Sequence, residues 1–145
     1  MSSDPFTYYL RVRYVECDAQ KVVFNSRYGE YVDAAMTEFL RAIGFRDQLL
    51  SGEIDFQLVK QTTQWKAPAR FDDVLAIAVI PRHLGNTSFT LGSEFRIKGS
   101  AALVAEVETV YVLVDAATLT KTPLPPAFRA ALDGGARGQK IDHGG

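Results

Sequence analysis

The chain has 145 residues, a formal net charge of −1 and 47% hydrophobic residues. These values predict one globular domain and exclude a chain that is disordered throughout. The near-zero charge argues against a nucleic-acid binder, and no apolar run reaches the roughly 18 residues that a membrane span requires. Because Cys17 is the single cysteine and the N-terminus lacks a secretory signal pattern, we expect a reducing, cytoplasmic setting.

A strand, a loop and a helix are predicted in the first half of the chain. Residues 7–15 alternate between apolar and polar side chains, which predicts a strand, and a loop over 16–24 follows. From Asn25 the spacing changes to that of a helix of about five turns, with Gly44 as its C-terminal cap and a short helical or irregular stretch over 45–52. The apolar stripe of this helix consists of Tyr28, Tyr31, Val32, Ala35, Met36, Phe39, Leu40 and Ile43.

The second half is predicted to be almost entirely β-structure. Its segments either alternate in polarity or are continuously apolar, and turn residues separate them. The expected strands are 56–66, 74–80, 87–98 and 103–115, with a loop over 81–86. A short helix is predicted over 126–132, and we expect the glycine-rich tail over 133–145 to be flexible.

These elements predict one α+β domain over residues 1–132. The last four strands have no helix between them, so most of the sheet must be antiparallel. The helix has a stripe wider than a coiled-coil seam and must be buried against that sheet. A twisted sheet of about five strands curled around a single helix satisfies both requirements. Neither face of the 103–115 strand is polar enough to face only water, so we expect self-association through sheet edges.

One carboxylate, Asp18, stands in the loop directly before the helix. A helix start carries unpaired backbone N–H groups and a partial positive charge. A carboxylate beside such an end can attack a carbonyl, or direct water at it, while the N–H groups hold the carbonyl oxygen. The pattern therefore predicts hydrolysis that needs no metal, catalytic histidine or cofactor.

Several residues near this carboxylate have both a structural and a functional interpretation. Asn25 is a favoured helix N-cap, and its side chain is also placed to orient water or substrate. Tyr28 and Tyr31 belong to the apolar stripe, and each can point a hydroxyl into an acyl pocket. Glu16 and Asp33 are expected to face solvent or to form ion pairs.

Other reactive groups lack the partners that catalysis needs. Cys17 has no histidine nearby in the sequence, and Glu30 lies off the apolar stripe, which indicates a structural role. His83 and His143 have no second ligand at metal spacing. No serine stands in a nucleophile-elbow context, and no glycine-rich phosphate loop follows a strand.

Two segments resemble a known family. They are YVECDAQKVVFN, from Tyr14 to Asn25, and WKAPARFDDVL, from Trp65 to Leu75. Both are similar to the hotdog-fold acyl-CoA thioesterases of the 4-hydroxybenzoyl-CoA thioesterase branch, which includes the short-chain acyl-CoA thioesterases of the Tol–Pal cluster. The resemblance covers residues 6–128.

The resemblance implies a hotdog fold, in which an antiparallel sheet wraps a long helix and two protomers form a continuous sheet, often within a homotetramer. It implies that Asp18 is the catalytic carboxylate, as nucleophile or general base, and that the backbone N–H of Phe24 or Asn25 holds the thioester oxygen, with Tyr28 positioning the substrate. The active site would lie between two protomers. The residues implied for coenzyme A binding are Arg82, His83, Asn86, Thr87 and Ser88.

The chain departs from the family pattern in three places. Gln20 and Lys21 stand where close relatives have glycine, and Asn25 stands where many members have histidine. The segment Arg82–Asn86 carries less positive charge than its counterpart in the 4-hydroxybenzoyl enzyme. The predicted function is hydrolysis of a small acyl-CoA, short aliphatic or aromatic.

Three other functions compete with hydrolysis. A dehydratase of the same fold needs a histidine in the helix region, which this chain lacks. A non-catalytic module that binds acyl-CoA or acyl-carrier protein would keep the pocket without the carboxylate, and Asp18 is present. A purely structural domain is favoured only if the loop before the helix is closed to solvent.

Overall fold

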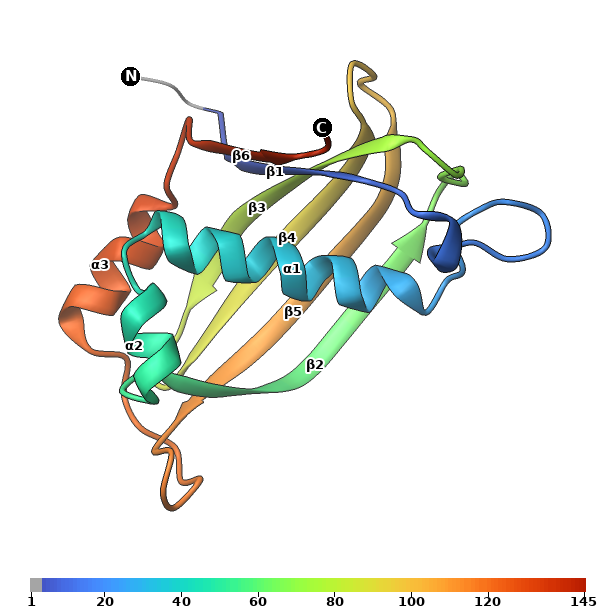
Figure 1. The fold of residues 1–145 in the computed structure, drawn as a ribbon. Coiled ribbons are helices and arrows are strands. Elements are labelled where there is room, and N and C mark those ends of the chain that lie inside the picture. Colours follow the sequence, from blue (N-terminus) through green and yellow to red (C-terminus); the bar gives the residue numbers. More distant parts are fainter. Residues whose placement is uncertain (1–3) are drawn as a thin grey trace.

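The computed structural model describes residues 4–145 as one six-stranded sheet wrapped around helix α1 (Figure 1). The strand order is β2-β5-β4-β3-β1-β6, and all neighbours are antiparallel except β1 and β6. This arrangement confirms the predicted α+β class and the mainly antiparallel sheet. The strands are β1 (Phe6–Arg11), β2 (Asp55–Trp65), β3 (Val74–Leu84), β4 (Ser88–Ile97), β5 (Leu103–Val114) and β6 (Lys140–His143).

Helix α1 (Arg27–Ala42) lies in the concave face of the sheet. Its 16 residues make it shorter than the predicted helix of about five turns. The predicted apolar stripe is confirmed from Tyr28 to Leu40, and the ring of Phe39 packs edge-on against Phe6 at 5.8 Å. Gly44 follows the helix with a φ of +90°, a conformation that favours glycine over residues with a Cβ.

Strand β1 is shorter than the predicted strand over 7–15. It ends at Arg11, and a single 3-10 turn, η1 (Tyr14–Glu16), begins the loop. The Val12 N–H donates to the Asp73 carbonyl at 2.8 Å in the same register as the β1–β3 ladder, and the chain leaves the sheet directly after this bond. Alternating polarity alone did not reveal this exit, because Tyr14 continues the pattern while standing exposed.

Strand β3 runs through part of the loop predicted over 81–86. It continues to Leu84 because the register shifts between Pro81 and His83, and such a bulge accommodates a proline that cannot donate to the ladder. Arg82 and His83 are therefore strand residues, and the turn to β4 contains only residues 85–87.

The C-terminal segment differs from the predicted flexible tail over 133–145. Helices α2 (Arg46–Ser51) and α3 (Pro126–Gly134) form as predicted, but β6 then pairs in parallel with β1. Its His143 ring meets the Tyr8 hydroxyl at 3.0 Å. The tail therefore covers the β1 edge, and within the described residues the two edge strands are the four-residue β6 and the longer β2.

Candidate active site

Asp18 lies in a small hairpin that projects beyond the start of α1 (Figure 1). The Asp18 N–H donates to the Val22 carbonyl at 3.0 Å, and the Lys21 N–H donates to the Asp18 carbonyl at 2.9 Å. The exposed Asp18 carboxylate accepts the Gln20 N–H at 2.8 Å, which fixes its orientation through the Asx turn. Lys21 has a φ of +63°, the left-handed conformation that a glycine adopts without steric strain.

The turn after β2 supports this hairpin from one side. The Val23 N–H donates to the Ala69 carbonyl at 2.8 Å, and the Phe71 N–H donates to the Lys21 carbonyl at 3.0 Å. The two segments that carry the family resemblance are thus in direct contact, and the second is a support for the first.

The first turn of α1 presents backbone N–H groups next to the hairpin. Ser26, rather than Asn25, is the N-cap, so the predicted capping role of Asn25 is wrong. The Phe24 N–H donates to the Glu16 carbonyl at 3.0 Å and is already engaged. Among residues 4–145, the N–H groups of Asn25 and Ser26 have no acceptor within hydrogen-bonding distance. Both residues are exposed, so these amides are the ones available to a ligand.

Tyr28 lies in the core and away from the surface of the hairpin. It is 2% exposed, and its ring packs edge-on against Tyr31 at 5.9 Å and Phe95 at 5.3 Å. Burial raises the pKa of its hydroxyl, which also hydrogen-bonds to the Ala69 backbone. The structure therefore gives this tyrosine a packing position, and its predicted contact with substrate has no geometric support in one protomer.

Glu16 is buried behind the hairpin and is bound by two other side chains. Its carboxylate accepts hydrogen bonds from Arg13 Nε at 2.9 Å and from the Tyr31 hydroxyl at 2.8 Å. Burial raises the pKa of Glu16, but these hydrogen bonds outweigh burial and hold the pKa below its ordinary value. The sequence predicted a solvent-facing or ion-paired Glu16 but not its link to α1, because Tyr31 lies fifteen positions further along the chain.

Cys17 and the two histidines lack the arrangement of catalytic groups. The Cys17 thiol donates to the Arg13 carbonyl at 3.6 Å, and burial with the neighbouring charges of Glu16 and Asp18 raises its pKa, so it stays protonated. His143 is hydrogen-bonded to Tyr8 at the edge of the sheet opposite β2. No group of three or more His, Cys, Asp or Glu side chains is placed to hold a metal within residues 4–145.

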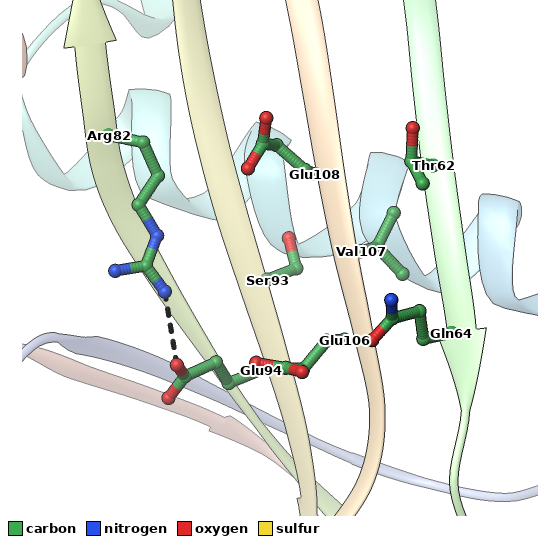
Figure 2. Close-up of a pocket in the computed structure, with 8 residues that line it drawn as sticks. All are labelled: Thr62, Gln64, Arg82, Ser93, Glu94, Glu106, Val107 and Glu108. Carbon is green, nitrogen blue, oxygen red and sulfur yellow. Dashed lines mark hydrogen bonds and ion pairs between the residues drawn. The ribbon is translucent and has the colours of Figure 1, made fainter.

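The predicted coenzyme A residues do not meet Asp18 within one protomer. Val74 begins β3 near the hairpin, and the strand carries the chain over roughly 33 Å to the turn that precedes Ser88. This turn lies at the opposite end of the sheet from Asp18 (Figure 1). Arg82 points to the outer face of the sheet, where its guanidinium pairs with Glu94 at 3.1 Å (Figure 2).

A cavity of about 230 Å³ on this outer face is acidic. Figure 2 shows the carboxylates of Glu94, Glu106 and Glu108 around it, with Arg82 across from them. Gly92 gives the guanidinium its room, because a Cβ there would lie 2.6 Å from Arg82 Nε. The cations around it are already paired, Arg82 and Arg96 with Glu94 and Lys66 with Glu106, and Glu108 adds a negative charge, so this cavity does not suit the phosphates of coenzyme A.

A sheet wrapped around one helix is the hotdog architecture. The chain belongs to the thioesterase-like superfamily, whose sequence profile matches residues 12–132. It is an enzyme of the thioester-hydrolase class. Within the described residues, no helix is both long and apolar enough to cross a membrane.

Relatives along nearly the whole chain support this assignment. The acyl-CoA thioester hydrolase YbgC of Escherichia coli O6:H1 (strain CFT073) is 31% identical over 131 residues, which cover 90% of this chain and 97% of the relative. The acyl-CoA thioesterase YbgC of Haemophilus influenzae is 26% identical over 133 residues, with 90% and 96% covered. The BH1999 gentisyl-coenzyme A thioesterase structure superimposes with a TM-score of 0.77 at 32% identity, covering 86% of this chain and 98% of that one.

Proposed function

We propose that this enzyme hydrolyses the thioester of a small acyl-CoA to the free acid and coenzyme A, with Asp18 as the catalytic carboxylate. One observation carries the proposal. An exposed carboxylate, held by the Gln20 N–H, stands in a hairpin beside a helix start whose Asn25 and Ser26 N–H groups are unsatisfied within the described residues. The hairpin is open to solvent, which argues against a purely structural domain.

The helix start would hold the thioester carbonyl oxygen. Backbone N–H groups aimed at an oxygen that gains negative charge stabilise the tetrahedral intermediate, and the helix dipole adds to this effect. Because the Phe24 N–H is engaged by Glu16, we assign the donor role to Asn25, with Ser26 beside it. Of the two predicted donors, the Asn25 N–H is therefore preferred over the Phe24 N–H.

Two routes use the Asp18 carboxylate. As a nucleophile it would attack the carbonyl carbon and form a mixed anhydride, the thiolate of coenzyme A would leave, and water would then cleave the anhydride to regenerate the carboxylate. As a general base it would take a proton from water as the water oxygen attacks, and the thiolate would leave from the tetrahedral intermediate. Both routes consume one water and release the same products.

Antiparallel pairing of two β2 edges would complete the site between protomers. Gln57, Val112 and Ser88 form one row across the sheet, so the start of β2 and the β3–β4 turn lie at the same end. In such a dimer the start of the partner's β2 would lie beside Trp65, at the Asp18 end of this protomer. The partner's β3–β4 turn would follow two strands away, roughly 10 Å across the sheet.

The acyl-CoA class of substrate comes from the relatives. The YbgC proteins are acyl-CoA thioester hydrolases, and a structural neighbour at 32% identity is a gentisyl-coenzyme A thioesterase. We extend the coenzyme A thioester to this chain, with a short aliphatic or aromatic acyl group. A reducing cytoplasmic setting, where coenzyme A thioesters are used, fits the half-buried free thiol of Cys17.

Release of free thiol from a panel of aliphatic and aromatic acyl-CoAs tests the proposal. Asp18→Asn should abolish release while the far-ultraviolet circular dichroism stays unchanged. Asp142→Asn is the matched control, because Asp142 also accepts the N–H two residues ahead, at 2.7 Å, but lies on β6. Equal rates for wild type and Asp18→Asn would overturn the proposal. Binding of acyl-CoA without hydrolysis of any panel member would favour the binding module instead.

A further inference from the structure

We propose that Glu16 is a positioning residue, which fixes the Asp18 hairpin against the first turns of α1 through Arg13 and Tyr31. The proposal rests on the proposed role of Asp18. Glu16 does not reach the surface of the hairpin, since it is 3% exposed, so any effect on the reaction must pass through the residues it holds.

The Glu16 carboxylate is saturated with hydrogen bonds. It accepts the Arg13 N–H at 2.8 Å, Arg13 Nε at 2.9 Å, Arg13 Nη2 at 2.6 Å and the Tyr31 hydroxyl at 2.8 Å. Four donors match the lone-pair sites that an ionised carboxylate offers. Three of them come from the residue that precedes η1 and one comes from α1, so the carboxylate joins the two elements on either side of Asp18.

The backbone of Glu16 begins the ladder that ends at Asp18. Its carbonyl accepts the Phe24 N–H at 3.0 Å, and the next residues along the two strands, Cys17 and Val23, form a β-bridge. The Asp18 N–H then bonds to Val22. A movement of Glu16 would therefore shift both the Asp18 carboxylate and the Phe24 N–H, which comes directly before the Asn25 N–H in the chain.

The α1 side of this contact is rigid. The Tyr31 ring packs against Tyr28 at 5.9 Å and against Phe95 of β4 at 6.4 Å, which fixes where its hydroxyl stands. A second contact joins the same elements, since Arg27 Nη2 donates to the Val15 carbonyl at 3.2 Å. Side chains from both elements thus fix the distance between the helix start and the hairpin.

The contact between Glu16 and Tyr31 is a hydrogen bond with open space beside it. A cavity of about 280 Å³ adjoins both residues, between α1 and the β1–β6 edge. Its other charged groups already have partners: Glu30 pairs with Arg27, and Arg11 donates to the Gly144 carbonyl. Substitutions that keep the size of the two side chains therefore remove the contact without creating a clash.

Steady-state kinetics with Tyr31→Phe and Glu16→Gln tests the proposal. We expect kcat to fall roughly tenfold for Tyr31→Phe and further for Glu16→Gln, because small misplacements of reacting groups have effects of about this size. The KM should stay within about twofold, since neither side chain is exposed to substrate. Tyr8→Phe is the matched control, because Tyr8 lines the same cavity but its hydroxyl bonds, among residues 4–145, only to His143, and the kcat of this variant should equal that of wild type.

A readout of hairpin opening separates positioning from stability. Hydrogen exchange at the Phe24 amide and tryptic cleavage after Lys21 should both quicken in the two variants and stay unchanged in Tyr8→Phe. The Glu16→Gln/Tyr31→Phe double variant should lose little more kcat than Glu16→Gln alone, because both act through one contact.

The outcomes distinguish this proposal from the proposed function. Lowered melting temperatures with an unchanged kcat of the folded enzyme would overturn positioning and leave the role of Asp18 intact. Full activity of Asp18→Asn would overturn the proposed function itself. If Glu16→Gln does not fold, Tyr31→Phe decides alone, because it removes one hydrogen bond and keeps the contacts of Arg13.

Discussion

The Phe24 N–H donates to the carbonyl of Glu16 at 3.0 Å, and this bond decides which amides remain for a ligand at the start of α1. By sequence offset, Phe24 and Asn25 were equal candidates for the oxyanion donor. With the first engaged, the Asn25 N–H is the first unsatisfied backbone donor of the helix start within the described residues.

Removal of this N–H by Asn25→Pro should lower kcat by about 100-fold or more, the size of effect seen when one oxyanion donor is lost. Asn25→Ala keeps the N–H and removes only the side-chain amide, so its kcat should stay within a fewfold of wild type. The comparison is made on folded protein, checked by circular dichroism. Equal losses in both variants would assign the function to the Asn25 side chain instead.

The Glu16–Tyr31 pair predicts a stability that depends on pH at both ends. The pKa of Glu16 lies below its ordinary 4.5, so the ionised carboxylate stabilises the fold above about pH 4.5, and this contribution is lost as the pH falls. Burial and the Glu16 contact raise the pKa of Tyr31 above its ordinary 10.0, so its neutral form stabilises the fold below that pH, and the contribution is lost as the pH rises further.

Urea unfolding across the pH range measures this dependence. The difference in free energy of unfolding between wild type and Glu16→Gln should be largest near neutral pH, about 1–3 kcal/mol, and should shrink in acid. Tyr31→Phe should show its difference shrinking above about pH 10. A constant difference at every pH would show that the pair does not titrate with folding.

Lys21 occupies a backbone conformation that suits glycine. Its φ of +63° is strained by roughly 1–2 kcal/mol for a residue with a Cβ, and glycine recovers part of this while it adds freedom to the unfolded chain. We therefore expect Lys21→Gly to raise the free energy of unfolding by up to about 1 kcal/mol. Lys21→Ala removes the same charge and keeps the strain, so it should be no more stable than wild type in urea unfolding.

The sequence predicted the elements whose signals are local. The period of the stripe from Tyr28 to Leu40 and the polarity pattern of the strands were enough for the α+β sheet around one helix. The resemblance added the hotdog family. It did not place β6, because a four-residue strand in a glycine-rich tail forms only by pairing with β1.

The candidate site was likewise predicted only where its signal is local in the sequence. Asp18 was predicted because a carboxylate before a helix start is readable from spacing alone. The link from Glu16 to Tyr31 was missed, since a contact across fifteen residues depends on how the hairpin folds back on α1. The sequence did not predict that Arg82 pairs with Glu94, because the bulge at Pro81 sets the face of the sheet on which Arg82 lies.

The open β2 edge predicts a dimer in solution. The opposite edge strand, β6, has only four residues, while β2 has eleven and its Leu58 and Val59 are 48% and 54% exposed. Antiparallel joining of two copies would bury these side chains near the two-fold axis and satisfy the free edge. We expect twice the monomer mass in light scattering, or a multiple of that dimer if the predicted homotetramer forms.

Val59→Glu should convert this assembly to monomers, because two like charges would then meet at the axis. If the site lies between protomers, kcat/KM should fall as the dimer dissociates. Raising the protein concentration should restore both the dimer and kcat/KM. Lys140→Glu on β6 is the control, since it changes charge at the opposite edge of the sheet and should leave mass and activity unchanged. Full activity in a Val59→Glu monomer would place the complete site within one protomer.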